Sequence, residues 1–200
     1  MLISHRTSVV ARLGTAQTLA WASSYYLPAM LATAMAADLG VSVTTVFAAF
    51  SFALIVSAVF GRWAGQLIDH HGGRPVLIGT NLLFAAGLLA LSLAQGPVLL
   101  FLAWGLIGVA MAAGLYDAAF ATLVRLYGHD ARSSITGITL IAGFASTVGW
   151  PLTAWLELEF GWRGACLCWA GLHLLLGLPL NASLPRARAA PGAEPVPAAV

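Results

Sequence analysis

The chain has 200 residues, of which 60% are hydrophobic and only 8% are charged, and its formal net charge is +2. Soluble domains carry about a quarter of their residues as charged side chains, so this composition excludes an ordinary soluble globular protein. The small net charge gives no basis for predicting a nucleic-acid partner.

Long apolar runs predict six membrane-spanning helices. A helix needs about 20 residues to cross a bilayer, and these runs are continuously apolar, whereas the strands of a membrane barrel alternate. The first run is longer than the apolar region of a secretory signal, about 7–15 residues, so it is kept as a span. The predicted spans are residues 13–37, 42–62, 75–94, 98–124, 133–156 and 164–183. The predicted fold class is an all-α polytopic membrane protein.

The arginines predict the orientation of these spans. Arginines in short loops stay on the cytoplasmic side, and only Arg163 of the nine falls in a segment that this topology places outside. Both termini are therefore expected in the cytoplasm, and the expected location is the cell (inner) membrane. The expected domains are a cytoplasmic N-terminus (1–12), a six-helix transmembrane domain (13–183) and a flexible cytoplasmic tail, or the start of a central linker, rich in Pro and Ala (184–200).

A weak internal repeat accompanies the six spans. When the chain is shifted by 89 residues, five identities fall within 18 positions, and chance remains an alternative in so apolar a chain. Such a shift moves the sequence by three helices, so the second copy would be inverted in the membrane, as in secondary transporters. The identical pairs are Ser57 with Ser146, Val59 with Val148, Leu67 with Leu156, Gly72 with Gly161, and Arg74 with Arg163.

A polar segment between the second and third spans resembles a family signature. In the major facilitator superfamily this loop has the form G-x-L-x-D-R-x-G-R-R, and here it reads GQLIDHHGGR from Gly65 to Arg74. The glycine, leucine, aspartate, second glycine and final arginine match in register, while His70 and Gly73 replace two arginines. The chain therefore resembles the N-terminal six-helix half of a major facilitator transporter over about residues 10–185. The short motifs FGWR at 160–163 and GWP at 149–151 support the same resemblance but are less specific.

The resemblance implies that Gly65, Asp69, Gly72 and Arg74 form a gating loop that holds the two halves of a transporter together. The residues themselves indicate a tight turn, because Gly72 and Gly73 can adopt backbone angles that are closed to other residues. Gly65 would let a neighbouring helix approach closely. Asp69 would need a partner at a helix C-terminus, from Arg74 or from the start of a neighbouring helix. The alternative is a solvated turn with ordinary cytoplasmic charges.

Asp117 is the sharpest candidate for chemistry, because the predicted span 98–124 contains it. An unpaired carboxylate at that depth costs several kcal/mol, so it should face a cavity or partner, or take up a proton. Its functional interpretation is a proton-coupling site or a ligand for a cationic group. The structural alternatives are a hydrogen bond to a tyrosine, or a shorter helix that leaves Asp117 near water.

The resemblance also implies a substrate cavity lined by the first, second, fourth and fifth helices. Pro28 and Pro151 would each weaken a helix and permit a bend. Trp104 stands where drug/proton exporters of this family carry an arginine, which puts that activity in doubt. The expected cavity residues are Trp21, Tyr25, Tyr26, Tyr116, Asp117, Ser146 and Trp150.

The predicted function is a secondary transporter, or half of one, that moves a small solute by alternating access, with proton coupling left open. Its expected partners are the lipid bilayer and a second six-helix half or a homodimer partner. The alternatives are a non-transporting interaction protein, a truncated remnant, and an intramembrane serine protease built from Ser146 and His173. The protease motif G-x-S-G is missing, and His173 is better explained as a hydrogen-bonded core residue. No enzyme activity, cofactor or metal site is predicted, and the substrate and the direction of transport stay open.

Overall fold

The computed structural model of the chain describes residues 2–186, with side chains from residue 5 onward. Its regular structure in this part of the chain is helical throughout, without strands. The helices are α1 (Leu2–Ser23), α2 (Leu27–Leu39), α3 (Val43–His71), α4 (Gly73–Ser92), α5 (Pro97–Gly114), α6 (Tyr116–Tyr127), the 3-10 turn η1 (Gly128–Asp130), α7 (Ala131–Ala142), α8 (Ala145–Leu172), the π-helical turn η2 (His173–Gly177) and α9 (Leu178–Ala182).

Three helical runs are long and apolar enough to cross a membrane: Val43–His71, Gly73–Ser92 and the joined run Pro97–Ala182. The last run has 86 residues, several times the length that one crossing needs. Its backbone leaves helical geometry at Leu115 and again at Gly161. These lengths and compositions agree with a multi-pass membrane protein.

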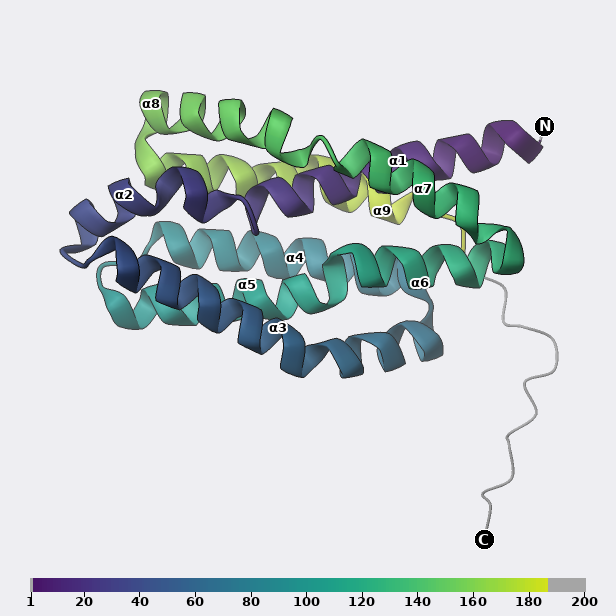
Figure 1. The fold of residues 1–200 in the computed structure, drawn as a ribbon, viewed down its shortest axis with the longest axis horizontal. Coiled ribbons are helices and arrows are strands. Elements are labelled where there is room, and N and C mark those ends of the chain that lie inside the picture. Colours follow the sequence, from purple (N-terminus) through teal and green to yellow (C-terminus); the bar gives the residue numbers. More distant parts are fainter. Residues whose placement is uncertain (1, 187–200) are drawn as a thin grey trace, which may run out of the picture.

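The helices lie roughly parallel to the long axis of the molecule, and their turns gather at its two ends (Figure 1). At one end lie the α2–α3 turn, the α4–α5 turn and the kink of α8 at Gly161. The α3–α4 turn and the η1 turn lie at the other end, together with the start of α1. We call these the Gly161 end and the Gly72 end, after the glycine in a turn at each.

Small residues let the central helices pack closely. A side-chain carbon on Gly108 of α5 would lie 2.4 Å from the carbonyl oxygen of Ala53 on α3. One on Gly87 of α4 would lie 2.6 Å from Ile107 on α5. Close backbone approach of this kind is how helices associate in lipid, where burial of apolar surface gives little driving force. Trp104 and Phe84 are the largest side chains fully buried in this core.

Several boundaries differ from those predicted. The second span was expected to end at residue 62, but α3 continues to His71, because leaving the apolar region does not oblige a helix to stop. The first span breaks between α1 and α2, two residues before Pro28. The span predicted at 98–124 breaks at Leu115, and the boundary predicted between the fifth and sixth spans lies inside α8. The expected tail from residue 187 onward lies outside the described residues.

Candidate functional site

A pocket of about 410 Å³ opens between α1, α3, α5 and α6. Four of the seven expected cavity residues belong to its lining, which mixes aromatic, small and polar side chains. The lining residues are Trp21, Tyr25, Leu54, Ser57, Ala58, Met111, Ala112, Leu115, Tyr116 and Asp117.

An aromatic cluster forms the wall of this pocket. The ring centroids of Trp21 and Tyr116 lie 4.9 Å apart, and those of Trp21 and Tyr25 lie 5.2 Å apart. Tyr26 extends the cluster, with its ring 5.5 Å from Tyr25 and 6.4 Å from Trp150. Aromatic pairs at such distances attract one another beyond the burial of their area, so the cluster ties α1 to α6 and α8.

Two helix breaks meet beside the pocket. Between α1 and α2 the Tyr26 amide donates to the Trp21 carbonyl, five residues back, instead of the usual four. Between α5 and α6, Leu115 is extended, with φ −91° and ψ −163°. Buried Gln17 links the body of α1 to the break between α5 and α6, because its Nε2 donates to the Gly114 carbonyl at 2.8 Å. The side-chain amide thereby satisfies a carbonyl close to the break in the helical ladder.

Asp117 lies in the first turn of α6, not inside an unbroken helix as predicted. The break at Leu115 places the carboxylate at the positive end of a helix dipole, which stabilises a negative charge there. Its side chain is exposed and lines the pocket. The carboxylate is therefore accessible from the pocket.

The remaining expected cavity residues lie further out. Among the described residues, Trp150 has its ring contact with the cluster through Tyr26 alone, and it is 46% exposed. Ser146 lies in the first turn of α8 and does not line the pocket. Pro151 lies within α8, and the non-helical dihedral angles of that helix fall at Gly161 instead.

Phe50, Trp104 and Gln17 extend the site beyond the predicted residues. Phe50 packs on Tyr25 and on Trp104, with centroid distances of 5.6 and 5.4 Å. The indole nitrogens of Trp21 and Trp104 are buried without a hydrogen-bond partner among the described residues. Gln17 was recognisable in sequence as a polar residue within the first apolar run, whereas Phe50 carried no signal in so apolar a helix.

The expected gating loop is largely helical. Gly65 and Asp69 belong to α3 and Arg74 to α4, and only Gly72 lies between them, with φ 83° and ψ 159°. The sequence predicted that a neighbouring helix approaches Gly65 closely. This prediction is wrong within the described chain, because nothing lies within 4 Å of a side-chain carbon placed on Gly65.

Arg125 of α6, not Arg74, contacts the end of α3. Its guanidinium donates to the carbonyl of Ile68 at 3.0 Å and to that of Asp69. A cation at this position satisfies free carbonyls and complements the negative end of the helix dipole. Among the described residues, Asp69 and Arg74 do not form an ion pair with each other.

His173 is a hydrogen-bonded core residue, as predicted. It is fully buried, its Nε2 lies 2.7 Å from Ser23 Oγ, and its Nδ1 lies 3.0 Å from Asn81 Oδ1. Ser23 Oγ lies within hydrogen-bond distance of the Leu19 carbonyl of its own helix as well, at 2.8 Å, and its single hydrogen serves one of these two contacts. This network joins α1, α4 and η2, and it pairs His173 with Ser23 rather than with Ser146. Because Ser23 and His173 are inaccessible, they offer no nucleophile to a substrate.

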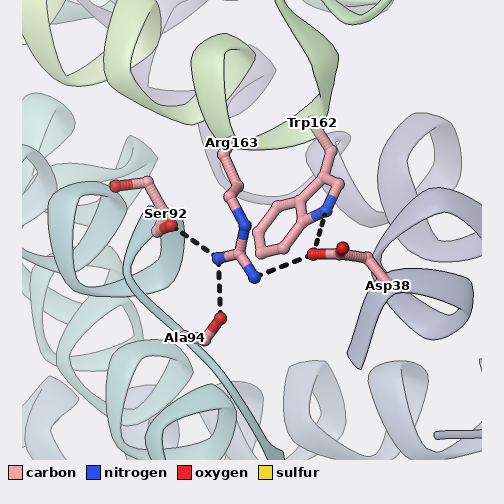
Figure 2. Close-up of polar contacts among 5 residues, drawn as sticks. All are labelled: Asp38, Ser92, Ala94, Trp162 and Arg163. Carbon is pink, nitrogen blue, oxygen red and sulfur yellow. Dashed lines mark hydrogen bonds and ion pairs between the residues drawn. The ribbon is translucent and has the colours of Figure 1, made fainter. Parts of the chain in front are cut away.

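An ion pair closes the Gly161 end (Figure 2). Arg163 donates to Asp38 Oδ2 at 2.7 Å, and the Trp162 indole donates to the same oxygen at 3.1 Å. The other arm of Arg163 donates to the carbonyls of Ser92 and Ala94 at 2.7 and 2.6 Å. One guanidinium thus joins α8 to the ends of α2 and α4. Among the described residues, no group of three or more His, Cys, Asp or Glu side chains is placed to hold a metal ion.

Comparison with known proteins identifies the family. The family model described as Major Facilitator Superfamily matches residues 13–199. The chain belongs to the major facilitator superfamily. A 38 kDa protein of Thermoproteus tenax, described as uncharacterized and encoded in a 23S RNA operon, is 34% identical over 167 residues, covering 83% of this chain and 43% of that protein.

Two relatives carry transporter or resistance names. Human monocarboxylate transporter 2 is 30% identical over 127 residues, covering 62% of this chain and 26% of that protein. The multidrug resistance protein MdtH of Aeromonas hydrophila is 32% identical over 120 residues, covering 59% of this chain and 30% of that protein. The chain therefore spans less than half the length of each of these relatives.

Proposed function

We propose that this chain supplies one six-helix half of a secondary transporter that moves a small solute by alternating access. The observation that carries the proposal is the pocket between the two helix breaks, with an aromatic wall and one carboxylate. Transporters typically build their sites from interrupted helices, because freed backbone groups and helix ends can then face the solute. The unpartnered Trp21 indole beside the pocket would donate a hydrogen bond to a polar group of that solute.

The proposed architecture has six spans in two inverted three-helix repeats, from about residue 13 to 183. Four glycines with positive φ occur in the described residues, and they form pairs 88 and 89 residues apart: Gly40 with Gly128, and Gly72 with Gly161. The helices α2 and α6 follow the same spacing, since their first residues, Leu27 and Tyr116, are 89 apart. Gly72 and Gly161 also share nearly the same φ and ψ, whereas Gly40 and Gly128 share only the sign of φ. The recurring positions of these turns and helix starts, at the spacing of the weak sequence repeat, support one duplicated unit. In this proposal the Gly72 end and both termini face the cytoplasm.

Asp117 is the proposed coupling residue. It is the acidic residue of the pocket lining, and its place at the start of α6 keeps it accessible. Protonation would remove the charge at one stage of the cycle and release it at another, which links proton movement to solute movement.

A second six-helix unit, from another segment or another copy, is the proposed partner. In α3, only 17% of the most apolar window is buried, and large apolar residues such as Phe47, Ile55, Val59 and Trp63 are exposed. The longer relatives have room for such a unit, and alternating access needs two bodies that move about the site.

Filling the pocket tests the proposal. Ala112→Trp would occupy the space beside Asp117, while Leu102→Trp, on the exposed face of the same helix, is the matched control. Uptake and efflux of a panel of labelled small solutes would be measured in membrane vesicles that contain the full chain. We expect at least one solute to move with the wild type and with Leu102→Trp, and not with Ala112→Trp. Equal flux in all three would contradict the assigned pocket, and no flux above empty vesicles would favour the non-transporting alternative.

Asp117→Asn tests the coupling role separately. The amide has nearly the shape of the acid but cannot exchange a proton, so we expect loss of accumulation driven by a pH gradient. The free energy of unfolding should fall by no more than about 1 kcal/mol, because the side chain is exposed and loses only its interaction with the dipole of α6. Asp117→Glu is the control that keeps the acid. Accumulation at the wild-type level in the Asn variant would leave Asp117 without a coupling role.

A further inference from the structure

A basic pocket of about 300 Å³ lies at the Gly72 end, where α3 turns into α4. Its polar lining is cationic or neutral, and no carboxylate belongs to it. The lining residues are His71, Gly72, Arg74, Pro75, Ile78 and Arg186. The turn joins the two candidate spans Val43–His71 and Gly73–Ser92, so it lies at a face of the membrane, where lipid headgroups are found.

The two arginines of this pocket are available for a ligand. Neither Arg74 nor Arg186 has a hydrogen bond or an ion pair among the described residues. Arg125, which lies close to Gly72, is already engaged with the end of α3. The pocket also adjoins the start of α4, whose positive dipole end favours an anion. Asp69 is exposed nearby on α3 but does not reach the lining.

An apolar groove of about 610 Å³ continues from the basic pocket along α4. His71 and Pro75 line both spaces, so the two are contiguous. The groove is also lined by Leu67, Val76, Gly79, Thr80, Leu82, Leu83, Ala86 and Ala113. From Pro75 to Ala86 the helix rises about 16 Å, which matches the depth of one leaflet of a hydrocarbon core about 30 Å thick.

We propose that one anionic phospholipid occupies this composite site. Its phosphate lies between Arg74 and Arg186, and an acyl chain lies in the groove beside Leu83 and Ala86. A free anion would leave the apolar groove empty. A zwitterionic lipid such as phosphatidylcholine would bring its own cation close to both guanidiniums, and that cation would offset the attraction of its phosphate. A basic pocket at the membrane surface that leads into an apolar groove matches both parts of such a lipid. This proposal does not depend on the transport function.

Native mass spectrometry of the full chain in an uncharged detergent tests the headgroup. Phosphatidylglycerol, phosphatidylcholine with the same acyl chains, and inorganic phosphate would each be titrated. We expect phosphatidylglycerol to bind most tightly, with about fivefold loss for Arg74→Gln or for Arg186→Gln. Arg62→Gln, an exposed arginine of α3 outside both pockets, should change nothing. Equal binding of the two lipids, or an equal loss with Arg62→Gln, would overturn the proposal.

A second pair of variants tests the acyl chain. Ala86→Trp fills the groove and should weaken both lipids, whereas Leu89→Trp, exposed on the same helix outside the groove, should weaken neither. Inorganic phosphate should compete only weakly with phosphatidylglycerol, because it gains nothing from the groove. Unchanged lipid binding in Ala86→Trp, or full displacement by phosphate at equal concentration, would reduce the site to a small-anion pocket and contradict the proposal.

Discussion

The Gly72 and Gly161 turns are nearly identical in backbone and opposite in their contacts. Gly72 has φ 83° and ψ 159°, and Gly161 has φ 68° and ψ 172°, and an arginine follows two residues later in each case. Arg163 binds Asp38 and two backbone carbonyls, whereas Arg74 binds nothing among the described residues. The Gly161 end is therefore closed within the chain, while the Gly72 end keeps a free cation for something outside it. The two turns thus have similar backbone conformations and different contacts.

The largest effects are expected from the glycines themselves. Gly72→Ala and Gly161→Ala should each lower the free energy of unfolding by about 1–3 kcal/mol, because this backbone region is closed to residues with a side-chain carbon. At Gly161 no atom lies within 4 Å of that carbon, so the cost is conformational alone. This loss of stability would be measured by unfolding each variant in mixed micelles that contain an increasing fraction of a denaturing detergent.

Gly171→Ala is the matched control for this prediction. Gly171 lies in the same helix as Gly161, with equal space around it and no positive φ, so the change should be neutral or slightly stabilising. Wild-type stability in Gly161→Ala would mean that the two turns do not share the conformation described.

Replacing Arg163 or Arg74 should have a smaller effect on the free energy of unfolding, and the two effects should differ. Arg163→Leu should cost about 1–2 kcal/mol, because charge-assisted hydrogen bonds to three oxygens are lost, and solvent at a side chain that is 37% exposed weakens them. Arg74→Leu should change the free energy of unfolding by less than about 0.5 kcal/mol, since Arg74 has no hydrogen bond or ion pair among the described residues. The same unfolding assay would measure both variants. Equal losses of stability for Arg163→Leu and Arg74→Leu would contradict the difference described between the Gly161 end and the Gly72 end.

Replacing Asp38 or Asp69 should give the smallest difference in the free energy of unfolding. Asp38→Asn should cost about 0.5–1 kcal/mol at low salt and less at high salt, because it removes a partly exposed ion pair but keeps an acceptor for Trp162. Asp69→Asn should have no measurable effect, since its carboxylate has no partner among the described residues. If Asp38→Asn lost the same stability at low and high salt, the charge of Asp38 would not be the source of its stabilising effect.

Hydropathy was enough to predict a multi-pass helical protein, and the motif at residues 65–74 was enough to predict its family. Both follow from local rules, since a span needs a continuous apolar run and a tight turn needs glycine. The ring packing of Trp21 with Tyr25 and Tyr116 agrees with the aromatic wall expected from the sequence, but the Trp21 indole has no hydrogen-bond partner among the described residues.

The breaks and the polar partners could not be predicted in this way. No proline marks the break at Leu115, which coincides with a contact between Gln17 and Gly114 that are 97 residues apart. Likewise, Arg125 at the end of α3 and Asp38 beside Arg163 are chosen by tertiary packing. Local patterns do not encode which distant side chain meets a helix end, so Asp117 was placed inside a helix instead of at its start.

Sided chemical labelling tests the central claim, two inverted repeats with their turns on opposite faces, most directly. Single cysteines would be introduced at His70, Arg132 and Glu159 after Cys166 and Cys168 have been replaced by alanine, with that cysteine-free chain as control. We predict that an impermeant thiol reagent labels positions 70 and 132 only from the cytoplasmic side and position 159 only from outside. Labelling of positions 70 and 159 from the same side would contradict the inverted repeat and the account built on it.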